Sequence, residues 1–134
     1  MKNRTYTLYA VEQDVGEAWT GSTGQHYHAF LALVDETIGN TPKIIDEINF
    51  VSVEDGIALA DTRRWKEGQD FAKDYNSRGL LGGSQDFMLE LWDKAENNSR
   101  VIESLRFSFS RADKSPTAIN CRAAIIALIK SLGL

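Results

Sequence analysis

The sequence predicts an α+β fold in which a small antiparallel sheet packs on a buried C-terminal helix. Segments rich in β-branched and aromatic residues fill the first half of the chain, whereas apolar residues at helical spacing dominate the second half. The length of 134 residues, without an internal repeat or low-complexity tract, favours one domain over residues 1–134.

Three segments have the composition of strands. Residues 5–11 are rich in Thr, Tyr and Val, which favour strands. Residues 28–34 are apolar on both faces, which is typical of a central strand covered on both sides. Residues 44–53 alternate in a way that leaves one face partly polar. The pattern then weakens, and it supports only a short strand at 57–60 and a helical turn around Phe71.

Glycine marks the expected loops and turns. Residues 13–24 contain three glycines with Ser and Thr, and residues 39–42 form a Gly-Asn-Thr-Pro turn. Residues 76–84 contain Gly79, Gly82 and Gly83, so we expect a mobile loop there.

Two helices are expected near the C-terminus. Ser84 is a suitable cap for a helix that starts at Gln85 and continues to Leu105, although the polar residues 97–99 weaken its middle. A second helix has Pro116 in its first turn, is almost wholly apolar, and ends at Gly133. A polar linker at 111–116 joins the two.

Composition excludes several classes of protein. A net charge of -4 without a basic cluster argues against nucleic-acid binding. A single cysteine excludes an intrachain disulfide and favours a reducing compartment. The N-terminus lacks an apolar signal region, and no run of 18 apolar residues predicts a membrane span. We therefore expect a soluble cytoplasmic protein, with export by a specialised machine left open.

The single cysteine suggests thiol chemistry. Cys121 lies in the first turns of the last predicted helix, where unpaired N–H groups and the helix dipole favour a thiolate. A base is also needed, and the two histidines, His26 and His28, open the predicted central strand. Asn120 is placed to cap the helix or to donate to an oxyanion.

Two other interpretations stay open. Cys121 shares a helical stripe with Ile125, Leu128 and Leu132, so it is equally suited to a core position, and His28 to a core histidine. Alternatively His26, His28 and Cys121 form a zinc site with one open position. The dyad interpretation predicts no metal and no cofactor.

Three segments resemble a known superfamily. They are residues 28–33, residues 87–92, and residues 120–129 with Leu132-Gly133-Leu134. This order of strand histidine, amphipathic helix and Asn-Cys helix resembles the circularly permuted NlpC-type papain-like proteins. Their relatives include lecithin retinol acyltransferase-like enzymes, YiiX-type hydrolases and PPPDE-type peptidases.

The resemblance implies a permuted papain-like fold and roles for particular residues. Cys121 would be the nucleophile and His28 the base, with His26 as the alternative base. Glu47 or Asn49 on the third strand would orient the imidazole, as the third member of a triad does.

Together these observations predict a thiol hydrolase that cleaves an amide, isopeptide or thioester bond. Its substrate would be a peptide, a lipid or a ubiquitin-like acyl group, and residues 79–84 and 13–24 are the expected cleft walls. The competing hypothesis is a non-catalytic binding or adaptor domain in which Cys121 and His28 are core residues. The oligomeric state is left open.

Overall fold

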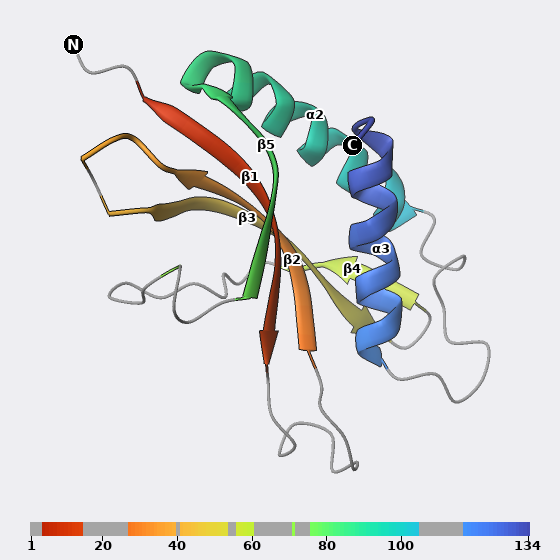
Figure 1. The fold of residues 1–134 in the computed structure, drawn as a ribbon. Helices are drawn as coiled ribbons and strands as arrows, with labels where there is room; N and C mark the ends of the chain where they lie inside the picture. The colour runs from red at the N-terminus through yellow and green to blue at the C-terminus, as the bar shows by residue number, and fades with distance from the viewer. Residues whose placement is uncertain are drawn as a thin grey trace.

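A computed structural model gives the fold, shown in Figure 1. The structure describes residues 4–14, 27–39, 41–53, 56–60, 71, 76–104 and 117–134. The described residues form one five-stranded antiparallel sheet in the order β4-β3-β2-β1-β5. Its strands are β1 (Thr5–Asp14), β2 (Tyr27–Asp35), β3 (Lys43–Val53), β4 (Gly56–Leu59) and β5 (Asn76–Ser84).

Two helices complete the described fold: α2 (Gln85–Ser104) and α3 (Thr117–Ser131). Both lie on one side of the sheet (Figure 1), where α3 packs on β2 and β3 and α2 touches β1, β4, β5 and α3. The predicted α+β class, with the C-terminal helix packed on an antiparallel sheet, is confirmed.

The main core lies between the sheet and the helices, on what we call the helix face. Large apolar side chains from β1, β2 and β3 meet those of α2 and α3 there, and burial of this area is the main stabilising term. The buried members of this cluster are Tyr6, Leu8, Leu31, Leu33, Ile48, Phe50, Ile57, Met88, Trp92, Ala95, Ile102, Ala124, Ile125, Leu128 and Leu132.

A smaller apolar cluster lies on the opposite face, which we call the back face. It comprises Val11, Phe30, Ala32, Val34, Ile44 and Phe71, with Tyr9 packed against it. Phe71 is in helical conformation, and its ring lies edge-on to Tyr9 with centroids 4.9 Å apart. The second strand is therefore apolar on both sides because each side faces a core, as predicted: β2 is the middle strand, and residues 29–34 are buried.

The prediction of a loop at residues 76–84 is wrong, because this segment forms the edge strand β5. It pairs with β1 along most of its length, from Thr5 opposite Ser84 to Glu12 opposite Asn76. A Cβ on Gly82 would lie 3.2 Å from the Thr7 hydroxyl, so glycine here suits close packing. The register shifts opposite Leu8 and Tyr9, leaving Leu80 as the extra residue of a bulge.

Local hydrogen bonds of polar side chains cap the start of α2 and satisfy the polar residues in its middle. Ser84 caps α2 as predicted, its Oγ accepting from the Phe87 amide at 3.4 Å. The polar residues 97–99, expected to weaken the middle of this helix, do not interrupt it. The Ser99 hydroxyl donates to the Glu96 carbonyl at 2.6 Å and the Asn98 amide to Ser131 of α3 at 2.9 Å, so both polar side chains are satisfied without breaking the helix.

The remaining boundaries lie close to the predictions. β1 extends to Asp14, beyond the expected start of the loop at Gln13, whereas the rest of that loop and the linker 111–116 fall outside the described residues. Past the end of α3, Gly133 adopts a φ of +80°, a conformation that favours glycine. Neither described helix has the length and apolar character needed to cross a membrane.

Candidate functional site

The backbone brings together the two elements that carry the candidate dyad. Cys121 is the fifth residue of α3, within its first two turns, and α3 packs on β2, whose second residue is His28. His26 and the side chains of His28, Asn120 and Cys121 lie outside the described residues. The expected contact between thiol and imidazole therefore stays a prediction.

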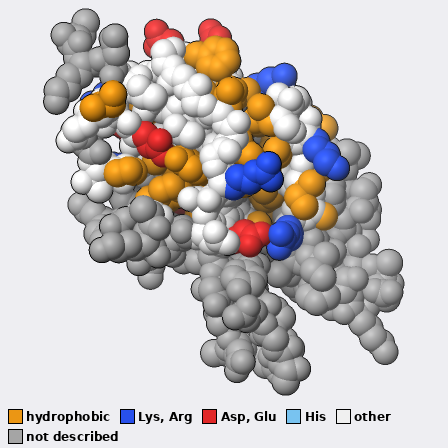
Figure 2. Space-filling view, viewed as in Figure 1, with side chains coloured by type: hydrophobic (Ala, Val, Ile, Leu, Met, Phe, Trp, Pro, Cys, Tyr) orange, Lys and Arg blue, Asp and Glu red, His pale blue; other side chains and the backbone are white. Residues whose placement is uncertain are grey.

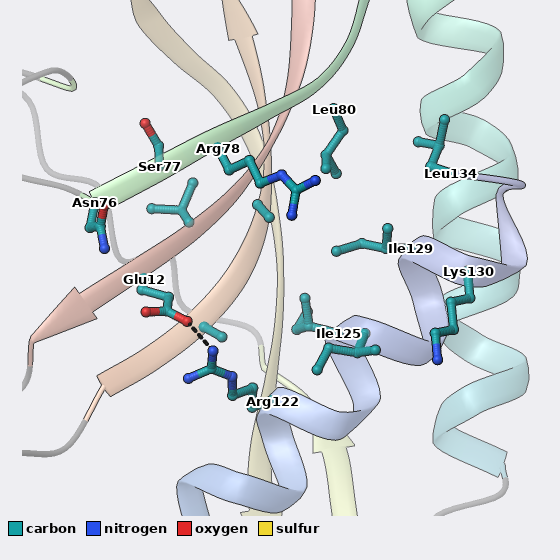
Figure 3. Close-up of a pocket in the computed structure, with 14 residues that line it drawn as sticks. Glu12, Asn76, Ser77, Arg78, Leu80, Arg122, Ile125, Ile129, Lys130 and Leu134 are labelled. Carbon is teal, nitrogen blue, oxygen red and sulfur yellow. Dashed lines mark ion pairs between the residues drawn. The ribbon is translucent and has the colours of Figure 1, made fainter.

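A pocket of about 520 Å³ opens between α3, β1 and β5 (Figure 3). Its lining includes Arg122, which follows Cys121, and Ala29, which follows His28. The pocket therefore lies next to the backbone positions of both candidate residues. Most of its wall is apolar, formed by Ala10, Val11, Ala29, Leu80, Ile125, Ile126, Ile129 and Leu134.

Charged side chains stand around this apolar wall. Arg78 comes from β5, Arg122 and Lys130 from α3, and Glu12 from β1. Glu12 Oε1 accepts from Arg122 Nη2 at 2.8 Å, and the arginine is half-exposed, so this ion pair contributes little to stability. Figure 3 shows the Arg78 guanidinium extending from β5 into the space between the sheet and α3.

The two faces of β2 limit which side chains can meet α3. Leu31 and Leu33 belong to the core under the helices, whereas Phe30 and its alternate neighbours belong to the back-face cluster. A side chain on β2 meets α3 only from the face of Leu31 and Leu33. Strict alternation would place position 28 on the face of Phe30, so a Cys121–His28 dyad requires a departure from strict alternation at the start of β2 that turns the imidazole to the helix face.

The structure places Glu47 on the back face. Glu47 is directly opposite Ala32 and Asn49 is opposite Phe30, and residues paired in this way share a face of the sheet. Asn49 is buried, and its amide donates to Glu47 Oε1 at 3.1 Å. Because the sheet separates this pair from α3, neither Glu47 nor Asn49 is brought to an imidazole that faces Cys121.

A second carboxylate on the back face is held by Tyr9 and Thr7. Both hydroxyls donate to Glu36. Burial, reinforced by the hydrogen bond to Glu36 and its negative charge, raises the pKa of Tyr9 to about 12. The phenol therefore stays protonated at neutral pH and acts as a structural donor.

Sequence reasoning missed Arg78 as a pocket residue. It lies in the segment expected to be a loop, and only the pairing of β5 with β1 brings it opposite α3. Arg78 and Leu80 are two residues apart, which is the spacing of side chains on one face of a strand. The surrounding glycines obscured this signal.

The described residues include no group of three or more His, Cys, Asp or Glu side chains able to hold a metal ion. The suggested zinc ligands His26, His28 and Cys121 fall outside that search, so the zinc alternative is not tested by it.

No protein-family model, curated protein or solved structure matches this chain. The resemblance to permuted NlpC-type proteins therefore stays a hypothesis that rests on the sequence segments alone.

Proposed function

We propose that this protein is a thiol hydrolase in which Cys121 is the nucleophile and His28 the base. The proposal requires that the start of β2 departs from strict alternation and turns the imidazole towards α3. One observation carries the proposal: a pocket opens where α3 packs against the sheet, and its lining includes the residues that follow Cys121 and His28. The first turns of a helix favour a thiolate, and the partly apolar wall of the pocket, which begins at Arg122 on α3, favours a neutral acyl group.

The proposed reaction is acyl transfer to water. The Cys121 thiolate attacks the carbonyl carbon of an amide, isopeptide or thioester, and backbone N–H groups of the first turn of α3 receive the oxyanion. The His28 imidazolium then gives its proton to the leaving amine or thiol. Water, deprotonated by the same imidazole, hydrolyses the thioester and regenerates the thiolate.

The dyad is proposed without Glu47 as a third member. Glu47 already accepts from Asn49 on the back face, and the sheet lies between it and α3. Asn120, next to the nucleophile in the first turn of α3, remains the proposed supporting donor.

Alkylation of the folded protein tests the proposal. At pH 6 iodoacetamide should modify Cys121 faster than a model thiol, and His28→Gln should remove this advantage while His26→Gln retains it. Alkylation only after denaturation would contradict the proposal.

Turnover supplies a second test. With a small activated thioester as substrate, Cys121→Ala should abolish hydrolysis and Asn120→Ala should slow it by ~10-fold or more. Glu47→Gln should leave kcat within about threefold, whereas a loss of ~10–1000-fold would restore Glu47 as a triad member.

The second candidate function is a non-catalytic binding domain. It is favoured by the stripe Ile125, Leu128 and Leu132, whose three side chains are buried and whose spacing extends back to Cys121. An inert thiol in the folded protein, together with a ligand for the pocket, would support this alternative.

A further inference from the structure

The pocket between α3, β1 and β5 has the dimensions and walls of a small-molecule site. Residues of α3, β1, β2 and β5 line it, and its volume of about 520 Å³ lies within the ~300–1000 Å³ that is usual for ligand pockets. The volume suits one small or chain-like molecule, which would lie along α3 between that helix and the strands (Figure 3).

Apolar side chains on the α3 side of the pocket are unusually open to solvent. Ile126 is 43% exposed and Leu134 is 41% exposed, although both are large apolar residues at a pocket wall. Ile129 and Leu80, which also line the pocket, are only partly buried. An apolar chain in the pocket would remove this surface from water, which is the main driving force for binding it.

The same pocket concentrates positive charge on an acidic protein. Among the described side chains that line it, the three cations Arg78, Arg122 and Lys130 stand against the carboxylate of Glu12, although the chain as a whole has a net charge of -4. Blue side chains stand beside orange apolar ones on this side of the molecule in Figure 2.

The three cations differ in their ion pairs. Arg122 is paired with Glu12, whereas Arg78 and Lys130 have no ion-pair partner within the described part of the chain. Figure 3 shows the Arg78 guanidinium at the pocket, from which it can bind a carboxylate through two parallel hydrogen bonds.

We infer that this pocket binds one molecule of an anionic amphiphile, an unbranched acyl chain ending in a carboxylate. The chain lies against Ile126, Ile129 and Leu134, and the carboxylate pairs with Arg78. The inference uses no chemistry of Cys121 or His28, and it holds whether or not the protein is a hydrolase.

Calorimetric titration with monomeric carboxylates tests the chain and the head group separately. From hexanoate to decanoate, affinity should rise about three- to fourfold with each added methylene and then level off when the pocket is full. Decyltrimethylammonium and decanol, which have the same chain without an anionic head, should bind at least tenfold more weakly than decanoate.

Charge variants with a matched control locate the head group. Arg78→Glu should weaken decanoate binding by at least tenfold, and Arg78→Gln should do so to a smaller degree. Arg100→Glu, which changes an exposed arginine on α2 outside the pocket, should bind as the wild type does.

Variants at exposed apolar positions test where the acyl chain of the ligand lies. Ile126→Asp should weaken binding at least tenfold, whereas Val101→Asp, at an exposed apolar position on α2, should not. Neither position is buried, so both variants should keep the wild-type thermal transition. Cys121→Ala should bind decanoate normally, which separates this site from the proposed catalysis.

Several results would overturn the inference. These are no saturable binding of any carboxylate, equal affinity for the cationic amphiphile, or an unchanged affinity in Arg78→Glu. Binding to phosphatidylglycerol vesicles or to an acidic peptide without binding of monomeric decanoate would assign the surface to another partner. If decanoate changed the amide chemical shifts of α2 and not those of Leu80 and Ile129, its acyl chain would lie outside this pocket.

Discussion

The two faces of the sheet are stabilised by different chemistry. The helix face is a continuous apolar core between the strands and the two helices. The back face has a smaller apolar cluster beside hydrogen-bonded polar groups, among them the Asn49–Glu47 and Tyr9–Glu36 pairs.

This difference indicates which part of the molecule can bind a ligand or carry out a reaction. On the back face the described carboxylates Glu36 and Glu47 already accept from neighbouring side chains, so their role there is structural. The margin of the helix face instead opens into a pocket that contains Arg78 and Lys130, which have no ion-pair partner among the described residues, and Cys121 belongs to the helix that forms one wall. The comparison therefore directs functional tests to that margin and stability tests to both faces.

The largest stability effect is expected on the helix face. Leu128 of α3 is fully buried against the sheet, so Leu128→Ala removes apolar contacts and leaves a cavity. The free energy of unfolding should fall by about 3 kcal/mol in urea denaturation. The control Ile126→Ala, at a partly exposed position on the same helix, should cost less than about 1 kcal/mol. Equal costs would mean that α3 is not anchored through this stripe.

A smaller effect is expected at the buried amide of the back face. Asn49→Ala removes the donor to Glu47 and leaves unfilled space, which should lower the free energy of unfolding by about 2 kcal/mol. Glu47→Gln keeps an acceptor oxygen and should cost less. If Asn49→Ala were neutral in urea denaturation, the polar pair would contribute nothing to that face.

A charged contact at the C-terminal end of β2, far from the pocket, should contribute still less to the free energy of unfolding. Asp35, opposite Tyr6, accepts from Thr37 and pairs with Arg4 at 2.9 Å. Burial alone would raise the pKa of Asp35, but the hydrogen bonds from Thr37 and the charge of Arg4 together lower it. Its stabilisation is therefore complete above the ordinary value of 3.8 and is lost as pH falls through the lowered pKa.

Asp35→Asn should accordingly lower the free energy of unfolding at pH 7 by about 1 kcal/mol. The gap from the wild type should narrow towards pH 2, where the wild-type carboxyl is also neutral. Asp93→Asn, at an exposed position on α2, is the control and should leave the free energy of unfolding at pH 7 within about 0.5 kcal/mol of the wild type. A gap that stays constant with pH would assign the effect to packing.

The smallest expected effect is a late ionisation of Tyr9, which is followed by absorbance. With its pKa raised to about 12, Tyr9 should ionise after an ordinary phenol, and the late phase at 295 nm should vanish in Tyr9→Phe. Because the neutral form is favoured in the folded protein, this stabilisation is present below pH 10 and is lost as pH rises through about 12. The absence of a late phase would mean that the Tyr9–Glu36 contact is not kept in solution.

Local sequence patterns determined much of the secondary structure. The two-sided apolar run of β2 identified the central strand, and helical spacing with Ser84 as the cap identified α2. The apolar run after Pro116 identified α3, and with it the placement of Cys121 in the first turns of a helix that packs on the strand of His28. These features depend on periodicity and capping, which act over a few residues.

Tertiary structure decided the rest. The glycines of residues 76–84 have weak strand propensity, and they form β5 because β1, about 70 residues earlier in the chain, offers an unpaired edge. The same pairing brings Arg78 to the pocket, and strand register places Glu47 on the face away from α3. Pairing partners and faces are set by contacts between distant segments, because a shift of one residue in register exchanges the two faces of a strand.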